Sequence, residues 1–104
     1  MRCQKLFEKG CIGGVEFRNR VAMTAMGNGL ASWDGEVSLE LIRFYEDRAR
    51  GGCGLIFTEF TRMDETSGAC NPNQLCIATR KHIRSTERVH CHGARIFVQL
   101  YHGG

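Results

Sequence analysis

The chain has no long apolar run, no cluster of basic residues and no paired cysteine motif. Its apolar stretches are all far shorter than the roughly 20 residues that a membrane-spanning helix requires. The N-terminal segment from Met1 to Leu6 also lacks the extended apolar region of a secretory signal. We therefore expect a cytoplasmic protein that has no membrane partner.

The net charge of +3 is spread along the 104 residues rather than gathered in one basic segment. Between residues 40 and 50, for example, arginines are interleaved with acidic residues. Such interleaving is typical of a solvated helix face and not of a nucleic-acid-binding patch, so we expect no nucleic-acid partner. The content of 42% hydrophobic and 24% charged residues is ordinary for a soluble globular domain and names no function.

The cysteines are scattered, and none of them forms a C-x-x-C pair. They are Cys3, Cys11, Cys53, Cys70, Cys76 and Cys91. An even number suggests disulfides in a small secreted chain, but no export signal is present. Cys11, Cys53 and Cys91 also lie in or beside apolar segments, where cysteine acts as a small hydrophobic residue. A zinc site from Cys70, Cys76, His90 and His92 is a minor alternative, because its spacing is irregular; we expect no metal.

Segments typical of strands and of helices alternate along the chain. The pattern predicts a hairpin at 11–17, strands at 21–26, 54–59 and 94–100, and helices at 39–50 and 82–92. Ser38 is the expected N-cap of the first helix, and the glycine pair 51–52 is its stop. On this helix we expect Arg43 to pair with Asp47, and Glu46 with Arg50. A long loop is expected from residue 61 to about 80, and His82, His90 and His92 are expected to face solvent.

Strands that alternate with helices predict right-handed crossovers and a parallel sheet, hence an α/β fold. No G-x-G-x-x-G follows the first strand, which disfavours an open dinucleotide-binding sheet. The leading hairpin would suit a plug at the N-terminal mouth of a (β/α)8 TIM barrel. Because a complete barrel takes about 250 residues, we expect residues 1–104 to be its N-terminal portion, a hairpin plus about three β/α units.

Three motifs resemble the N-terminal part of the old yellow enzyme family, in the branch of NADH:flavin oxidoreductases that includes 2,4-dienoyl-CoA and enoate reductases. They are LFxxxxIGxVxxRNRVxMxxMG at 6–27, FYxxRAxGGxGLIxTE at 44–59 and HGARIFVQLYHGG at 92–104. Together they cover almost the whole chain in the family's order. The resemblance implies a barrel that binds FMN at the C-terminal ends of its strands. It also implies that hydride passes from NADH or NADPH to an activated C=C bond of a small molecule.

The resemblance further assigns cofactor-binding residues at the strand ends. Thr24, Ala25, Met26 and Gly27 would lie along the flavin, where small side chains and backbone amides can approach the ring. Gln99 is a lone amide in an apolar strand, and a buried amide needs a partner; the flavin pyrimidine edge would supply one.

Phe60 is a further residue that the resemblance assigns to cofactor binding, and it departs from the family, which tends to have a small residue at this position. Tyr101 and His102 would follow the third strand on the catalytic side and could line the substrate cavity. Arg20 precedes the first strand, at the structural end of the barrel, and is expected to tie elements together.

The family's proton donors, substrate-binding residues and phosphate-binding loops lie in later strands, so no catalytic residue is assigned. An iron-sulfur cluster, where the branch has one, also lies after the barrel and beyond these cysteines. Two readings stay open: part of an FMN-dependent ene-reductase, or an inactive remnant that associates through an exposed sheet edge, with an oligomer possible. The substrate stays open as well.

Overall fold

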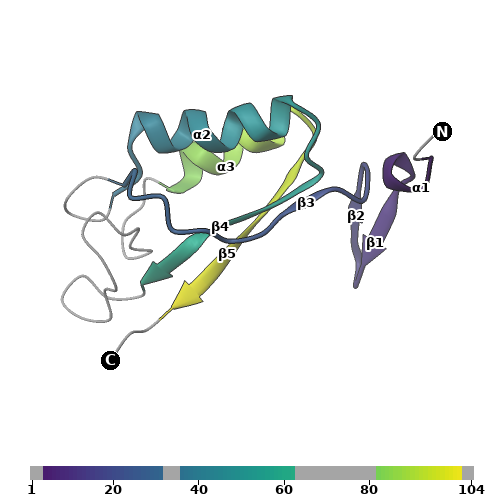
Figure 1. The fold of residues 1–104 in the computed structure, drawn as a ribbon, viewed down its shortest axis with the longest axis horizontal. Helices are drawn as coiled ribbons and strands as arrows, with labels where there is room; N and C mark the ends of the chain where they lie inside the picture. Colours follow the sequence, from purple (N-terminus) through teal and green to yellow (C-terminus); the bar gives the residue numbers. More distant parts are fainter. Residues whose placement is uncertain (1–3, 32–35, 63–81, 102–104) are drawn as a thin grey trace.

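The computed structural model describes residues 4–31, 36–62 and 82–101, with the side chains of 82–84 left aside. The elements run in the order α1 (Gln4–Phe7), β1 (Gly10–Ile12), β2 (Val15–Phe17), β3 (Ala22–Met23), α2 (Leu39–Arg50), β4 (Leu55–Arg62), α3 (His82–His90) and β5 (Arg95–Tyr101). Figure 1 shows the hairpin at one end of the molecule and the C-terminal ends of β4 and β5 at the other.

The strands form two sheets. β1 and β2 make the predicted antiparallel hairpin, and Gly13 takes a φ of 59° in its turn. The other three strands form a sheet in the order β3-β4-β5, and both pairings are parallel, with Ile56 beside Met23 on one side and Ile96 on the other. The expected hairpin and parallel βαβ crossovers are therefore confirmed.

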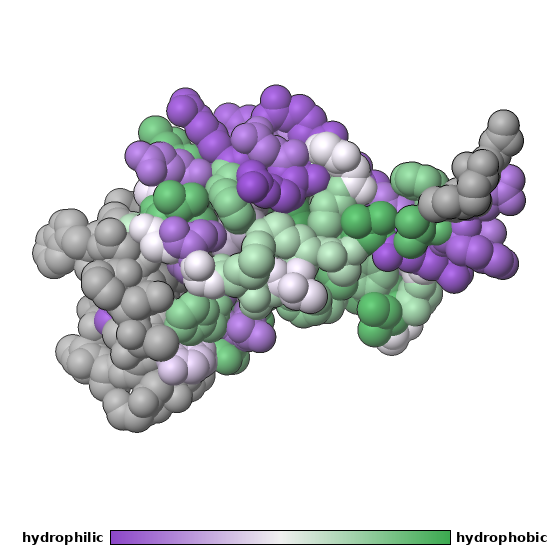
Figure 2. All heavy atoms as spheres, viewed as in Figure 1, coloured by the Kyte–Doolittle hydropathy of each residue, from purple (hydrophilic) through white to green (hydrophobic). Residues whose placement is uncertain are grey.

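Both longer helices lie on the same side of the three-stranded sheet (Figure 1). They bury a core in which Leu41 and Tyr45 of α2 pack with Ile56 of β4 and Val89 of α3, each at most 1% exposed. Figure 2 shows polar residues gathered over the outer side of α2, while apolar residues extend below it over the sheet. This amphipathic arrangement leaves the opposite face of the sheet for other contacts.

The predicted helix 39–50 is confirmed at both ends. The Ser38 hydroxyl accepts a hydrogen bond from the Leu41 amide at 3.1 Å, and it also donates to the Leu30 carbonyl. Gly51 ends the helix with a bond from its amide to the Asp47 carbonyl at 2.9 Å. These contacts satisfy backbone groups that every helix end leaves unpaired.

The predicted ion pairs of α2 are wrong in their partners. Asp47 pairs with Arg50 at i,i+3, with 2.5 Å between the carboxylate and the guanidinium. Glu46 instead binds His92, at 3.0 Å between Oε2 and Nε2. The i,i+3 and i,i+4 positions share one helix face, so sequence spacing could not choose between them. His92 is consequently half-buried between the two helices and does not face solvent as expected, whereas His90 is exposed.

Several element boundaries differ from the prediction. The strand expected at 21–26 pairs only over Ala22–Met23, because the ladder to β4 covers just these residues. β4 continues to Arg62, so the expected loop begins later than residue 61, and its remainder lies outside the described residues. α3 ends at His90, two residues earlier than expected, and Gly93 then turns the chain with a φ of 81°.

A single arginine, Arg18, joins the helix layer to the start of the sheet. Its guanidinium donates to the carbonyls of Ala49, Cys53 and His92, with the Cys53 bond at 2.7 Å. Arg20 makes the more local tie that was expected, since its guanidinium lies 3.9 Å from the Glu8 carboxylate and donates to the Lys9 carbonyl at 3.4 Å. The R-N-R sequence therefore has a structural role at the N-terminal ends of the strands.

Among the described cysteines, Cys11, Cys53 and Cys91 are all free thiols. Cys53 is half-buried, whereas Cys11 in β1 and Cys91 in the turn after α3 are exposed, so these two do not pack as small hydrophobic residues as expected. Within the described ranges, no three His, Cys, Asp or Glu side chains gather as metal ligands. Cys70 and Cys76 lie outside these ranges. No described helix is long and apolar enough to cross a membrane.

Candidate functional site at the strand ends

The C-terminal ends of β4 and β5 place chemistry-bearing side chains on the uncovered face of the sheet. Phe60 lies beside Gln99 in the ladder, and Arg62 lies beside Tyr101. Neighbours in a parallel ladder point to the same face, and residues two apart on one strand do so too. Phe60, Gln99 and Tyr101 therefore share one face, on the side opposite to the helices.

A β-bulge in β4 is what turns Phe60 to this face. The ladder pairs Phe57 with Phe97 and then Phe60 with Gln99, so β4 uses one residue more than β5 over the same distance. In an unbroken strand Glu59, not Phe60, would follow Phe57 on this face. The bulge therefore exchanges a carboxylate for an aromatic ring at the site, as bulges near functional sites often re-aim a side chain.

Buried polar groups hold the bulge in place. The Glu59 amide donates to the Tyr45 hydroxyl oxygen at 2.8 Å. The Glu59 carbonyl accepts from the Thr61 hydroxyl at 2.8 Å and from the Thr58 hydroxyl at 3.2 Å. The backbone groups that the bulge takes out of the ladder are thus satisfied by side chains, as buried groups require.

Burial raises the pKa of Tyr45 to about 12. The hydrogen bond from the Glu59 backbone acts in the opposite direction, the negative charge of the Glu59 carboxylate raises the value further, and the Asn28 side chain lowers it. The phenol therefore stays neutral at physiological pH and serves as a hydrogen-bonding group in the core.

The Glu59 side chain reaches from the bulge to the loop that follows β3. It is 1% exposed, and its Oε2 accepts a hydrogen bond from the backbone amide of Asn28 at 3.1 Å. The Asn28 side chain in turn accepts from the Leu30 amide at 3.0 Å, closing a tight turn. These two bonds fix the backbone of residues 28–30 against the end of β4.

Gly27 lies directly under the Phe60 ring. A Cβ atom at this position would come within 2.4 Å of ring atom Cε1, so the close approach requires glycine while the ring stays in place. The same ring packs edge to face on Tyr101, with 5.0 Å between the ring centroids and 87° between the planes. The structure thus brings together three of the predicted site residues from three separate strand ends.

The remaining predicted residues flank this cluster. Thr24 and Met26 are exposed and Ala25 is half-buried on the segment that leads to Gly27. Gln99 is exposed on the face opposite to the helices, so its amide is accessible, and its pairing with the flavin stays a prediction. His102 lies outside the described residues.

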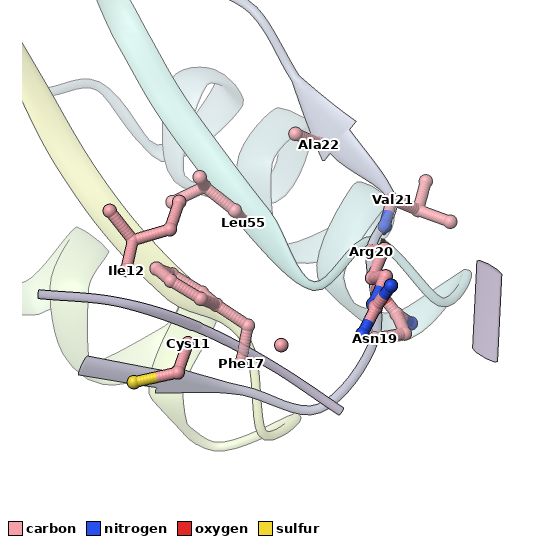
Figure 3. A pocket seen from close by; sticks show the side chains of 9 residues that line it. Cys11, Ile12, Phe17, Asn19, Arg20, Val21, Ala22 and Leu55 are labelled. Carbon is pink, nitrogen blue, oxygen red and sulfur yellow. Dashed lines mark hydrogen bonds between the residues drawn. The ribbon is translucent and has the colours of Figure 1, made fainter. Parts of the chain in front are cut away.

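A pocket of about 310 Å³ lies at the other end of the sheet. The side chains of Ile12, Phe17 and Leu55 enclose it between the hairpin and the strand starts, with Asn19 and Arg20 at its side (Figure 3). Phe17 also contacts Phe97 edge to face at 6.1 Å. The described residues that line this pocket are mostly apolar, and their packing between the hairpin and the strand starts agrees with the expected plug.

No motif predicts a site role for the residues that support the site from behind, which are Tyr45, Asn28 and Glu59. The arginine that links the helix layer to the sheet is Arg18, whereas only Arg20 was predicted to link elements. A signal existed for Glu59: a carboxylate within a nearly continuous apolar run needs a buried partner, by the argument that was applied to Gln99.

Comparisons with known proteins agree on one family and one fold. The profile of the NADH:flavin oxidoreductase / NADH oxidase family matches residues 5–104. The chain is 42% identical to an NADH oxidase of Thermoanaerobacter brockii, covering 95% of this chain and 16% of the relative. It is 37% identical to a cinnamate reductase of Clostridium sporogenes, covering 94% and 16%. An NADPH dehydrogenase of Halalkalibacterium halodurans is 36% identical, with 96% and 31% covered.

Solved structures show the same similarity in three dimensions. The old yellow enzyme of Trypanosoma cruzi matches with a TM-score of 0.83 and 29% identity, over 97% of this chain and 28% of that one. The old yellow enzyme homologue of Zymomonas mobilis matches with a TM-score of 0.82 and 27% identity, over 94% and 28%. The chain therefore spans less than a third of each of these proteins, and its strand–helix units have the arrangement of the start of their barrel.

Proposed function

Because the chain belongs to the NADH:flavin oxidoreductase / NADH oxidase family, we propose that residues 1–104 form the N-terminal part of an FMN-dependent ene-reductase barrel. The whole protein would take hydride from NADH or NADPH and deliver it to an activated C=C bond of a small molecule. The names of the relatives, an NADH oxidase and a cinnamate reductase among them, support this class of reaction.

The observation that carries the proposal is the meeting of Gly27, Phe60, Gln99 and Tyr101 at the C-terminal ends of adjacent parallel strands. Active sites of (β/α)8 barrels lie at this face. The end of the sheet that holds Arg18 and the hairpin packing lies opposite and is structural. The predicted site residues therefore lie at the end of the sheet where barrel active sites are found, and the structural contacts lie at the other end.

The residues present fit one edge of a flat flavin ring. The segment from Thr24 to Gly27 offers exposed backbone with side chains of modest size, and Gln99 offers an exposed amide with one donor group and one acceptor. FMN, when bound, would supply the transfer of hydride between nicotinamide and substrate. The chain's own part is to orient the ring through Gln99 and the backbone near Gly27, and Tyr101 and His102 would face the substrate.

Phe60 has a different part in this arrangement. Its aromatic ring packs on Gly27 and on the Tyr101 ring, so an apolar surface stands beside the candidate flavin site where the family tends to have a small residue. We expect it to exclude water from that side of the flavin rather than to bond to it.

The test is a complete barrel in which residues 1–104 replace the matching segment of the T. brockii NADH oxidase. We expect a yellow protein that keeps stoichiometric FMN through gel filtration and reduces an activated alkene with NADH. The unmodified oxidase is the control for recovery and flavin content. A folded chimera that elutes without flavin would refute the proposal.

A second candidate function is association through the open sheet. β3 and β5 each pair on one side only within the described sheet, and Met26, Val98 and Leu100 are large apolar side chains between 40% and 57% exposed. Exposed parallel edges with apolar flanks favour pairing with another chain. Sedimentation of the 104-residue chain tests this idea: a monomer at all concentrations would reject association.

A further inference from the structure

We propose that Glu59 is a positioning residue for the candidate flavin site: its buried carboxylate holds the Gly27–Asn28 backbone against β4 in the place where the ring would lie. This inference rests on the proposed function. It concerns a buried acidic group to which neither the sequence motifs nor the proposed chemistry assigns a role.

The first step is the direct contact. Glu59 Oε2 lies 3.1 Å from the Asn28 amide nitrogen, so the carboxylate fixes the peptide unit that joins Gly27 to Asn28. β3 stops pairing at Met23, and no ladder holds the segment after it. A bond to a charged acceptor is stronger than a neutral one, and here it takes the place of ladder bonds.

The second step is the orientation of Glu59 itself. The bulge points this side chain away from the open face. The bulge is kept formed by the bond from the Glu59 amide to the Tyr45 hydroxyl oxygen and by the bonds from the Thr58 and Thr61 hydroxyls to the Glu59 carbonyl. The same bulge presents Phe60 to the open face, over Gly27. The bulge in β4 therefore makes two contacts with the loop at Gly27 and Asn28. Glu59 bonds to the Asn28 backbone, and the Phe60 ring packs on Gly27.

The bond from the Asn28 backbone to Glu59 fixes the position of Gly27 at the candidate site. Loss of the Glu59 acceptor would leave the half-buried Asn28 backbone amide without its partner, and the loop would move to recover one. Gly27 would then leave its position beneath Phe60. The protein would then bind FMN more weakly, because the backbone groups near Gly27 would no longer be in place for the flavin ring, although no residue in contact with the ring had been substituted.

The experiment compares Glu59→Leu, Glu59→Gln and Thr61→Val. Thr61→Val is the matched control: it removes one buried hydrogen bond to the Glu59 carbonyl, but that carbonyl keeps the Thr58 hydroxyl as a donor, so the bulge and the bond to Asn28 should remain. In the FMN-binding chimera we expect Glu59→Leu to weaken FMN binding by about tenfold or more relative to Thr61→Val, the factor for one bond to a charged acceptor. Glu59→Gln retains an acceptor oxygen and should restore most of the affinity and the wild-type flavin absorption spectrum.

A second measurement does not require flavin. In the 15N-labelled 104-residue chain, we expect the Asn28 amide proton to lose its downfield shift and its protection from exchange in Glu59→Leu, and to keep both in Thr61→Val. Because it follows a single amide, this measurement separates loss of the contact from general destabilisation.

The outcomes separate the two proposals. Two results would overturn the positioning role alone. One is equal FMN affinity in Glu59→Leu and Thr61→Val, and the other is an Asn28 amide whose shift and exchange protection are unchanged in Glu59→Leu. A wild-type chimera that binds no FMN would overturn the proposed function and the role of Glu59 in it. If the Glu59→Leu chain does not fold, Glu59→Gln decides: its neutral acceptor should move the Asn28 backbone amide shift upfield, and a shift identical to that of the wild-type chain would overturn the contact.

Discussion

Tyr45→Phe isolates the contribution of a single hydroxyl to the fold. Tyr45 is 1% exposed, and its hydroxyl oxygen accepts the Glu59 amide at 2.8 Å. The substitution preserves the ring and its packing but leaves the amide of a buried residue without that acceptor. An unsatisfied buried donor costs about 1–3 kcal/mol, and for a domain of this size each kcal/mol lowers Tm by about 4–8 °C.

Thr61→Val provides the comparison. It removes a donor to the Glu59 carbonyl, but that carbonyl keeps a second donor in Thr58. We therefore expect a smaller loss, about 0.5–1.5 kcal/mol for one hydrogen bond. Urea denaturation followed by circular dichroism gives both values. Equal losses, or a larger loss for Thr61→Val, would refute the reasoning that the bulge amide depends on Tyr45.

Because the Tyr45 hydroxyl is buried, we expect the stability of the fold to depend on pH in the alkaline range. Burial raises the pKa of Tyr45 in the folded state from its ordinary value of 10.0 to about 12, so the folded state favours the neutral phenol. This contribution is fully present below pH 10 and is lost as the pH rises toward 12, to an extent of about 3 kcal/mol at most. Tyr45→Phe should flatten the stability profile in this window.

Three further predictions concern the site and the helix layer. In the FMN-binding chimera, Gln99→Ala should weaken FMN affinity by about threefold to tenfold, the range for one hydrogen bond, whereas the neighbouring Val98→Ala should leave it unchanged. The hydrogen bond from His92 holds the pKa of Glu46 below its usual value. The stability it gives is therefore present above about pH 4.5 and lost as the pH falls through the lowered pKa, and His92→Leu, which has no donor, should remove this acid dependence from denaturation curves. The isolated 104-residue chain should not keep FMN through gel filtration, because the resemblance assigns the phosphate-binding loops to later strands; a stoichiometric yellow protein would contradict this.

Most of the fold was predictable because its signals are local. Ser38 and the glycines that follow Arg50 bound α2 as expected, and an apolar run between two helices indicated a buried parallel strand. The exact length of β3 was not predictable, because apolar character continues to Met26 while pairing ends at Met23. Strand ends depend on the partner strand, which local sequence does not describe.

The site was predictable only in part, for a geometric reason. Alternation with a period of two places Phe57 and Glu59 on one face, and it places Phe60 on the other. The bulge reverses this assignment after Phe57, and the sequence carries no periodic signal of the extra residue. The resemblance named Phe60 as a departure from its family, but only the ladder register shows that its ring reaches Gly27.

The bulge also links the core to the site. Tyr45 belongs to α2 and is buried among Leu41, Ile56 and Val89, yet its hydroxyl holds the Glu59 backbone. Glu59 in turn holds the loop that contains Gly27 and Asn28. A substitution in the helix layer can therefore reach the strand ends through two hydrogen bonds, without any change on the open face. The ring position and the stability of the helix layer are consequently coupled, and the losses in Tyr45→Phe and Glu59→Leu should be less than additive when the two are combined.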